Sequence, residues 1–401
     1  MYNMRFLVLS CVFPPEQVTS ARTSYDVFKM AKREYEVVEV YCPTPSRGVS
    51  QSEGRIVQEG VHYLPSFKSK KSTFASRSIE NISFGISCFF RIFFTKKYDA
   101  CYVNSWPLFS VFFICLALSF KGTRIIYSIQ DLYPESLVVR GSIKRNSIFY
   151  KVLKYIEVLN CSMADSIICI SKTFKDYVLE ELGVRDESKV IVIPNWPKEI
   201  NSTAVHEGAF DTSMAARWRA KGRVLGYGGN FSFSTGVLEL IRSFESKDDT
   251  HILVCGAGAD LSSMIELSKS KAGTHIYSPW PRNLTNALYE EIDICLLPLI
   301  DGQGIASVPS KILDYASHKK PIICISNESC AATSFVEEYR LGVTVDWESF
   351  KRGLKKEFLD EVIKGYPSQE ALEKISEDRV KALNKMAFLI RKDFHKIEQG
   401  A

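Results

Sequence analysis

Short apolar segments alternate with amphipathic segments along most of the chain. The apolar segments have the length of strands, and the segments between them place apolar residues at helical spacing. Continuous apolar strands joined by helices predict a parallel sheet that is covered on both faces. In the first half we expect strands at 6–10, 36–41, 100–103, 124–128, 166–170 and 190–193, and helices at 22–32, 150–161 and 172–182.

The alternation stops at 194–197, where the sequence reads Pro-Asn-Trp-Pro, and it restarts after the polar residues 198–222. This predicts two doubly wound α/β domains, over 1–198 and 199–385, and a C-terminal helical segment, 386–401, that packs back on the first domain. Ligands of such sheets bind outside the carboxyl ends of the strands, so we expect the domains to face each other across a binding cleft. The second half should contain strands at 224–227, 251–254, 274–277, 294–298, 321–326 and 342–345, and helices at 236–244, 260–268, 284–291, 311–317, 330–339 and about 372–397.

Composition narrows the class of protein. A chain of 401 residues with 46% hydrophobic and 24% charged residues suits two or three globular domains. Its 11 cysteines form no Cys-x-x-Cys pair and its 6 histidines show no ligand spacing, so we expect buried reduced thiols in a cytosolic protein and no metal site. The apolar run at 6–10 is too short for a signal peptide, and the run at 106–120 is shorter than the ~20 residues of a spanning helix, which predicts a soluble or peripheral protein.

Basic residues concentrate at 67–97, although the formal net charge is only +5. This stretch has seven lysines and arginines against one acid, Glu80, and seven phenylalanines lie among them. A helix that combines cations with aromatic side chains suits an anionic membrane surface. The alternatives are a core helix with a solvated basic edge, and a nucleic-acid surface, for which the sequence shows no motif.

The segment Ser307-Val308-Pro309-Ser310-Lys311 predicts a phosphate site. It brings hydroxyls and a lysine to the start of an expected helix, where free backbone N–H groups favour an anion. The lysine adds a point charge suited to phosphate. Asp314 lies one turn further along and can accept hydrogen bonds from sugar hydroxyls, so the segment indicates a nucleotide.

Glycines follow the first two expected strands of the second half. Gly229 and Asn230 come after the first strand, and Gly256 and Gly258 come after the second. Glycine permits tight turns and lets a phosphate or a sugar approach the backbone. Each pair is a weak signal alone, but together with the segment 307–314 they predict a donor-binding site.

Two segments of the first half suit an acceptor. Ser20 and Arg22 open the helix after the first strand, where a small residue admits a ligand and an arginine reaches a phosphate; the alternative is that Thr19 only caps the helix and Arg22 only lies on the surface. Asp131 and Glu135 follow the strand at 124–128, where α/β enzymes place catalytic groups. One of them could act as a base toward an acceptor hydroxyl, and the alternative is a turn in which Asp131 caps the next helix.

Together these motifs resemble bacterial glycosyltransferases of the large retaining family 4, most closely those that build O-antigen, capsule or colanic-acid repeat units. The resemblance covers nearly the whole chain and implies the two-domain GT-B fold. It rests on Phe-Pro-Pro-Glu at 13–16, Asp-Leu-Tyr-Pro-Glu-Ser at 131–136, Ile-Pro-Asn-Trp at 193–196, Gly-Asn at 229–230, Gly-Ala-Gly at 256–258, Leu-Pro-Leu at 297–299, and Val-Pro-Ser-Lys at 308–311 with Asp314.

The resemblance implies that a sugar passes from a nucleotide-sugar, in the commonest case a UDP-sugar, to a hydroxyl with retention at the anomeric carbon and without a metal or other cofactor. Pro298 would join the donor contacts, and the catalytic group would comprise Asp131, Glu135, Lys311 and Asp314. The acceptor would be an undecaprenyl-diphosphate-linked saccharide, and the protein would be cytoplasmic and peripheral on the inner face of the cytoplasmic membrane, with no nucleic-acid partner.

The departures from the family pattern are specific. Many relatives carry two glutamates eight positions apart, where this chain has Ala306 and Asp314, which leaves the sugar-ring contact unassigned. Many also bind the diphosphate with an arginine and a lysine, where this chain has Asn230 and Thr235. We expect Lys311 and the N–H groups near Ser310 to supply that positive charge.

Two other functions remain open at this point. A nucleotide-sugar 2-epimerase has the same fold and donor, but it needs no lipid acceptor and a different acid/base set. A catalytically degenerate transferase that acts as a scaffold of a glycan assembly complex would explain the departures at 230, 235 and 306. An assay of the product formed without acceptor distinguishes the epimerase from the transferase. Nucleotide binding without turnover would indicate the scaffold.

Overall fold

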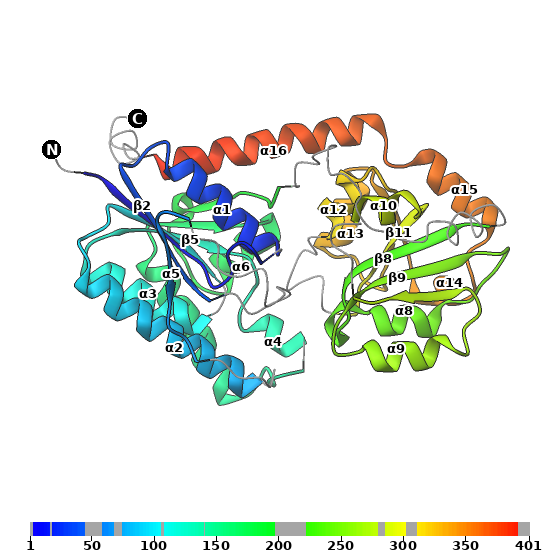
Figure 1. The fold of residues 1–401 in the computed structure, drawn as a ribbon, viewed down its shortest axis with the longest axis horizontal. Helices are drawn as coiled ribbons and strands as arrows, with labels where there is room; N and C mark the ends of the chain where they lie inside the picture. Colours follow the sequence, from blue (N-terminus) through cyan, green and yellow to red (C-terminus); the bar gives the residue numbers. More distant parts are fainter. Residues whose placement is uncertain are drawn as a thin grey trace. The chain divides into compact units, whose positions relative to one another are not determined.

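The computed structural model describes residues 3–16, 18–44, 58–67, 74–105, 108–139, 141–196, 222–279, 285–301 and 311–391. The chain divides into two compact units. Unit 1 comprises Met1–Asn195 and Val380–Ala401, and unit 2 comprises Trp196–Arg379. Each unit has its own parallel sheet flanked by helices (Figure 1), which is the expected doubly wound α/β architecture.

Unit 1 contains a seven-stranded parallel sheet in the order β3-β2-β1-β4-β5-β6-β7. The strands β4 (Ala100–Asn104) and β5 (Arg124–Ile129) are buried along their whole length, as their continuous apolar sequences predict. The six strands expected in this half are confirmed, and β3 (Val61–Leu64) is an additional, half-exposed edge strand. The others are β1 (Arg5–Leu9), β2 (Val37–Pro43), β6 (Ser166–Cys169) and β7 (Val190–Val192).

Three helices of unit 1 form one layer, with α3 (Leu108–Phe120) packed between α2 (Phe74–Phe94) and α5 (Ile148–Met163) (Figure 1). α3 has no charged residue, and its inner side is buried in the core. Ser147 caps α5 by accepting a hydrogen bond from the Tyr150 backbone N–H at 3.1 Å. The other helices are α1 (Thr19–Ala31), α4 (Glu135–Val139), α6 (Lys172–Glu180), the 3-10 turn Glu187–Lys189, and α16 (Gln369–Ile390), whose last residues belong to unit 1.

Unit 2 contains a six-stranded parallel sheet in the order β10-β9-β8-β11-β12-β13. Its strands are those expected from the sequence: β8 (Val224–Asn230), β9 (His251–Ala257), β10 (Thr274–Tyr277), β11 (Ile294–Pro298), β12 (Ile322–Ile325) and β13 (Gly342–Val345). Its helices are α8 (Val237–Ser243), α9 (Leu261–Ser268), α10 (Thr285–Glu290), α12 (Lys311–Ser317), α13 (Ala331–Glu338), α14 (Trp347–Lys351) and α15 (Lys356–Gly365), with a 3-10 turn at Phe233–Thr235.

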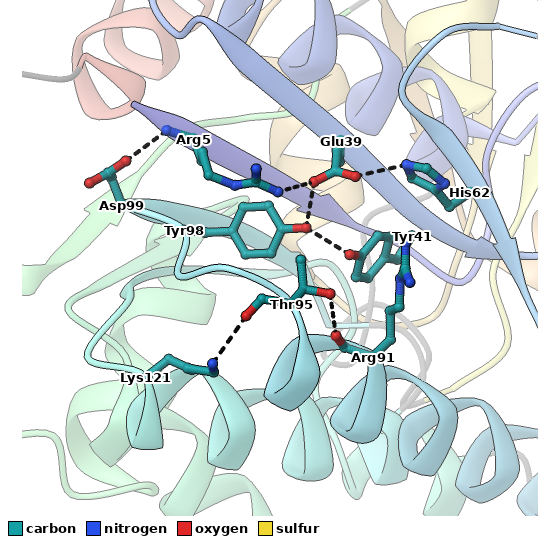
Figure 2. A network of polar contacts seen from close by, with 9 residues as sticks. All are labelled: Arg5, Glu39, Tyr41, His62, Arg91, Thr95, Tyr98, Asp99 and Lys121. Carbon is teal, nitrogen blue, oxygen red and sulfur yellow. Dashed lines mark hydrogen bonds and ion pairs between the residues drawn. The ribbon is translucent and has the colours of Figure 1, made fainter. Parts of the chain in front are cut away.

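A half-buried carboxylate ties the amino ends of the unit 1 strands together (Figure 2). Glu39 on β2 accepts hydrogen bonds from Arg5 at 2.6 Å and from the Tyr98 hydroxyl at 2.7 Å, and the Nε2 of His62 lies 2.8 Å from its other oxygen. The side chains therefore join β1, β2, β3 and the start of β4. An open cavity of about 500 Å³ adjoins this network at the edge of the sheet.

All 11 cysteines are free, and nine of them are buried. Burial raises the pKa of core thiols such as Cys115 and Cys255, which keeps them protonated and unreactive. The expected burial of the thiols is confirmed for these nine cysteines. Across the described ranges, no helix combines the length and the apolar character that a bilayer crossing requires.

Candidate active site

Five of the predicted donor residues of unit 2 lie in the described part of the chain, and they gather at one edge of its sheet. The chain order reverses between β8 and β11, and ligands of open α/β sheets bind at such a switch point, outside the carboxyl ends of the strands. Gly229 and Asn230 end β8, and Pro298 ends β11, so they flank this point from its two sides. Gly256 pairs with Gly229 in the register of β8 and β9, which brings the second glycine segment to the same edge.

Lys311 lies against Gly229. A methyl group built at Gly229 would stand 2.4 Å from Cε and 3.0 Å from Nζ of Lys311, so a side chain there would displace the end of this lysine. Gly229 also has a φ of +145°, which disfavours a side chain. The Lys311 ammonium stands 4.8 Å from the centroid of the Tyr227 ring, over its face. The lysine is thereby held at the carboxyl end of the central strand.

Gly256 and Gly258 are required by backbone packing. A methyl group at Gly256 would lie 1.8 Å from the Gly229 carbonyl oxygen, and one at Gly258 would lie 2.0 Å from the carbonyl oxygen of Phe231. The two segments that follow β8 and β9 therefore pack backbone against backbone. No side chain at these positions covers the backbone of the sheet edge, which suits close approach of a phosphate or a sugar.

α12 is anchored one turn after Lys311. Tyr315 is fully buried; its hydroxyl donates to the Leu296 carbonyl at 3.3 Å and accepts from the Gly228 N–H at 3.4 Å. These contacts attach the helix to β8 and β11 and so fix the position of Lys311. Asp314 lies three residues after Lys311, hence on the same side of α12, and it is half-buried.

The acceptor-side residues of unit 1 lie at the carboxyl ends of β1 and β5. Ser20 and Arg22 are in the first turn of α1, where the Ser24 hydroxyl donates to the Ser20 carbonyl at 2.8 Å. The N-cap of α1 is Val18, so the alternative in which Thr19 caps this helix is wrong. Arg22 is half-buried in the structure.

The two acids of the segment 131–136 have different surroundings. Asp131 is half-buried directly after β5, while Glu135 is only 9% exposed and accepts a hydrogen bond from the Tyr150 hydroxyl at 2.6 Å. Burial and the neighbouring Glu135 raise the pKa of Tyr150. Ahead of Asp131, the Gln130 side chain donates to Ser128 at 2.9 Å and accepts from Asn195 at 3.0 Å. Asp131 is thus the acid nearer to solvent, and Glu135 fastens α4 to α5.

The chain is similar to known glycosyltransferases in sequence and in fold. The sequence profile of Glycosyltransferase Family 4 matches residues 27–196. The chain is 24% identical over 230 residues to the probable glycosyltransferase WbjE of Pseudomonas aeruginosa, a match that covers 56% of each chain. Residues 27–196 are therefore similar to glycosyltransferase family 4. The matched stretch spans little more than half the length of WbjE.

Solved structures show that the chain has the GT-B fold. WaaG, a glycosyltransferase involved in lipopolysaccharide biosynthesis, aligns with a TM-score of 0.58 and 13% identity over 96% of this chain and 100% of WaaG. HepE of Anabaena, solved in complex with UDP, aligns with a TM-score of 0.60 and 13% identity over 100% of both chains. At such identities the likeness concerns the fold alone.

Asn230 and Thr235, which differ from the residues that the resemblance implied, have local roles. The Asn230 side chain donates to the Ser232 hydroxyl at 3.1 Å, and the Thr235 hydroxyl donates to the Asn230 carbonyl at 3.1 Å. Both side chains thus shape the turn after β8, which leads into Gly236 at φ +67°. Ser307, Val308, Pro309, Ser310 and Ala306 lie outside the described residues, so their predicted roles stay predictions.

Sequence reasoning missed one buried acid, Glu157 on α5. It accepts hydrogen bonds from the Tyr127 hydroxyl at 2.8 Å and from Asn160 at 3.0 Å, and burial raises its pKa to about 7. The signal was present, because Glu157 stands four residues after Leu153 on the apolar side of the expected helix. Among the described residues, no group of three or more His, Cys, Asp or Glu side chains could hold a metal ion.

Proposed function

We propose that the chain is a retaining, metal-independent glycosyltransferase that moves a sugar from a nucleotide-sugar to a lipid-linked saccharide in bacterial surface polysaccharide synthesis. The observation that carries the proposal is the placement of Lys311 across Gly229, at the switch point of a doubly wound sheet. A lysine that packs against a glycine and an aromatic ring has a defined position, which suits binding of an anion such as a diphosphate.

On the donor side, negative charge grows on the nucleoside diphosphate as the bond from the anomeric carbon to the phosphate oxygen breaks. The Lys311 ammonium stabilises that charge without reorganising, which is often the largest catalytic contribution. Asp314 accepts hydrogen bonds from donor hydroxyls. HepE, which has the same fold, was solved in complex with UDP and with UDP-glucose, and this supports a UDP-sugar as the donor.

On the acceptor side, the half-buried Asp131 accepts the proton of the acceptor hydroxyl. The acceptor oxygen forms the new bond to the anomeric carbon on the same face of the sugar from which the diphosphate leaves with the electron pair of the broken bond, so the configuration is retained. Glu135, held by Tyr150, keeps the segment 131–136 in place. Ser20 and Arg22, after β1, contact the acceptor.

The acceptor is a saccharide on undecaprenyl diphosphate, and the protein works as a peripheral protein on the inner face of the cytoplasmic membrane. The helix layer of unit 1 supports this part of the proposal, because it exposes apolar side chains beside cations, such as Phe90 and Phe94 next to Arg91 on α2. The relatives support a polysaccharide product: WaaG is involved in lipopolysaccharide biosynthesis.

The test is turnover of UDP-sugars with a lipid-linked saccharide extracted from bacterial membranes. We expect a product whose anomeric configuration, measured by NMR, matches that of the donor, at a rate that EDTA does not lower. Inversion at the anomeric carbon or loss of turnover in EDTA would contradict the mechanism. Conversion of the UDP-sugar without acceptor would indicate an epimerase instead, and nucleotide binding without turnover would indicate the scaffold.

A further inference from the structure

α5 carries a row of exposed apolar side chains, here called the stripe, on the side of the helix that faces away from the core. Ile148 is 81% exposed, Val152 is 47% exposed and Tyr155 is 64% exposed. Their spacing of four and three residues places them on one side of the helix, and Phe149 adjoins them. The stripe begins at the first residue of α5 and extends for two turns.

The surroundings of the stripe are basic. From 136 to 156 the sequence holds five lysines and arginines and no acid. Lys144 and Lys151 are exposed near the stripe, whereas the Arg145 side chain hydrogen-bonds Tyr150 on the other side of the helix. Lys154 points elsewhere, because it pairs with Glu181 on the far side of the helix at 2.6 Å. Apolar side chains flanked by cations form the surface of an interfacial helix.

The stripe lies at the active-site end of the unit 1 sheet. α5 ends at Met163, shortly before β6 begins at Ser166, so its last turn lies at the amino ends of the strands. A helix of 16 residues is about 24 Å long and spans the sheet, so Ile148 lies at the opposite edge, the carboxyl edge. Tyr150, two residues after Ile148, contacts Glu135 of the acceptor-side segment.

The aromatic end of α2 lies at the other edge. α2 ends at Phe94, shortly before β4 begins at Ala100, so Phe90 and Phe94 lie near the amino ends of the strands. The two exposed apolar surfaces of this helix layer are therefore separated along the strand direction. Of these two helices, α5 contacts the segment 131–136, through Tyr150, which lies on the buried side of the helix opposite the stripe.

We infer that the α5 surface, formed by Ile148, Phe149, Val152 and Tyr155 with Lys144 and Lys151, docks on a bilayer with anionic headgroups. The inference deepens the proposed function on which it rests, because α5 is bonded through Tyr150 to the acceptor-side segment 131–136, so that docking brings this segment near the membrane and its lipid-linked saccharides. The apolar residues enter the headgroup region, and the cations contact lipid phosphates. Residues 136–156 contain no acid, and the exposed Glu181 next to this helix is paired with Lys154, which limits repulsion of anionic lipids.

The experiment is sedimentation of the full chain with vesicles of phosphatidylcholine alone and of an equimolar mixture with phosphatidylglycerol. The apolar variant is Ile148→Ser/Val152→Ser, the charge variant is Lys144→Gln/Lys151→Gln, and the control is Ile265→Ser, an exposed isoleucine of α9 in unit 2. We expect the apolar variant to bind mixed vesicles about tenfold more weakly or worse. The charge variant should lose binding chiefly at low salt, and the control should bind as the wild type does.

Wild-type affinity in both α5 variants would overturn the inference, and so would equal loss in the Ile265→Ser control. Failure of the wild type to bind either vesicle would do the same and would direct attention to an acidic protein partner. Measuring the thermal stabilisation by UDP in the same variants distinguishes a failure of the docking inference from a failure of the proposed function. If the α5 variants keep that stabilisation and lose vesicle binding, docking is supported; if UDP stabilises no form but α5 still governs vesicle binding, the proposed function fails and the docking surface stands.

Discussion

The side chain of Lys311 occupies the space that a side chain at Gly229 would need, with 2.4 Å between the lysine Cε and a methyl group built on that glycine. The glycine of one strand end and the lysine of a helix eighty-two positions later therefore form a single structural feature. The Tyr227 ring lies under the Lys311 ammonium, and Tyr315 attaches the helix of Lys311 to β8 through the Gly228 N–H. Because the feature lies at the sheet's switch point, changes to either residue should report on donor binding.

Replacing Gly229 by Ala should displace Lys311 and strain the backbone. We expect weaker nucleotide binding, and a loss of about 1–3 kcal/mol in the free energy of unfolding from the unfavourable φ. Titration with UDP and urea denaturation measure the two effects. The control is Gly365→Ala, where a methyl group would meet nothing within 4 Å. Wild-type UDP affinity in Gly229→Ala would show that the position of Lys311 does not matter.

Replacing Tyr150 by Phe removes the hydroxyl that donates to Glu135 at 2.6 Å and leaves a buried carboxylate without that partner. We expect the free energy of unfolding to fall by about 1–3 kcal/mol. Tyr155→Phe, on the exposed side of the same helix, is the matched control and should be neutral. Equal stability of the two variants would mean that the hydrogen bond contributes nothing.

Glu157 should make stability depend on pH. Its pKa is about 7 in the fold against 4.5 when unperturbed, so the folded state binds more protons between these values. Stability from this group is therefore present at low pH and declines as pH rises from about 4.5 through 7, by up to about 3 kcal/mol.

Glu157→Gln abolishes that titration, since an amide stays neutral and can still accept from Tyr127. Urea denaturation at pH 5 and pH 8 measures the effect: the stability of the variant relative to wild type should improve at the higher pH. Glu180→Gln, an exposed residue of α6, is the control. The same relative stability of Glu157→Gln at both pH values would contradict the raised pKa.

Most of the fold could be predicted from the sequence, because continuous apolar strands are a strong local signal. β3 was missed because each of its four residues is only half-buried at a sheet edge, so no apolar run marks it. The predicted start of α5 at 150 fell two residues late, since Ile148 and Phe149 lie on the exposed side that a search for buried positions ignores.

The site was predictable in part. Glycines and a lysine near strand ends are visible in one dimension, but the contact of Lys311 with Gly229 depends on the packing of α12 against β8 through Tyr315. The burial of Glu135 depends on a tyrosine from the following helix and was equally invisible. The basic, acid-free run at 136–156 was visible, and it becomes informative once the fold places it at the carboxyl edge.

The most direct test of the account is the thermal shift that UDP gives to wild type, Lys311→Ala and the exposed control Lys269→Ala. At ~100 times its dissociation constant, UDP should stabilise wild type and the control by roughly 2.7 kcal/mol. Lys311→Ala should lose most of that shift while unfolding without ligand at the wild-type temperature. An undiminished UDP shift in Lys311→Ala would contradict the assignment of this lysine to the donor diphosphate.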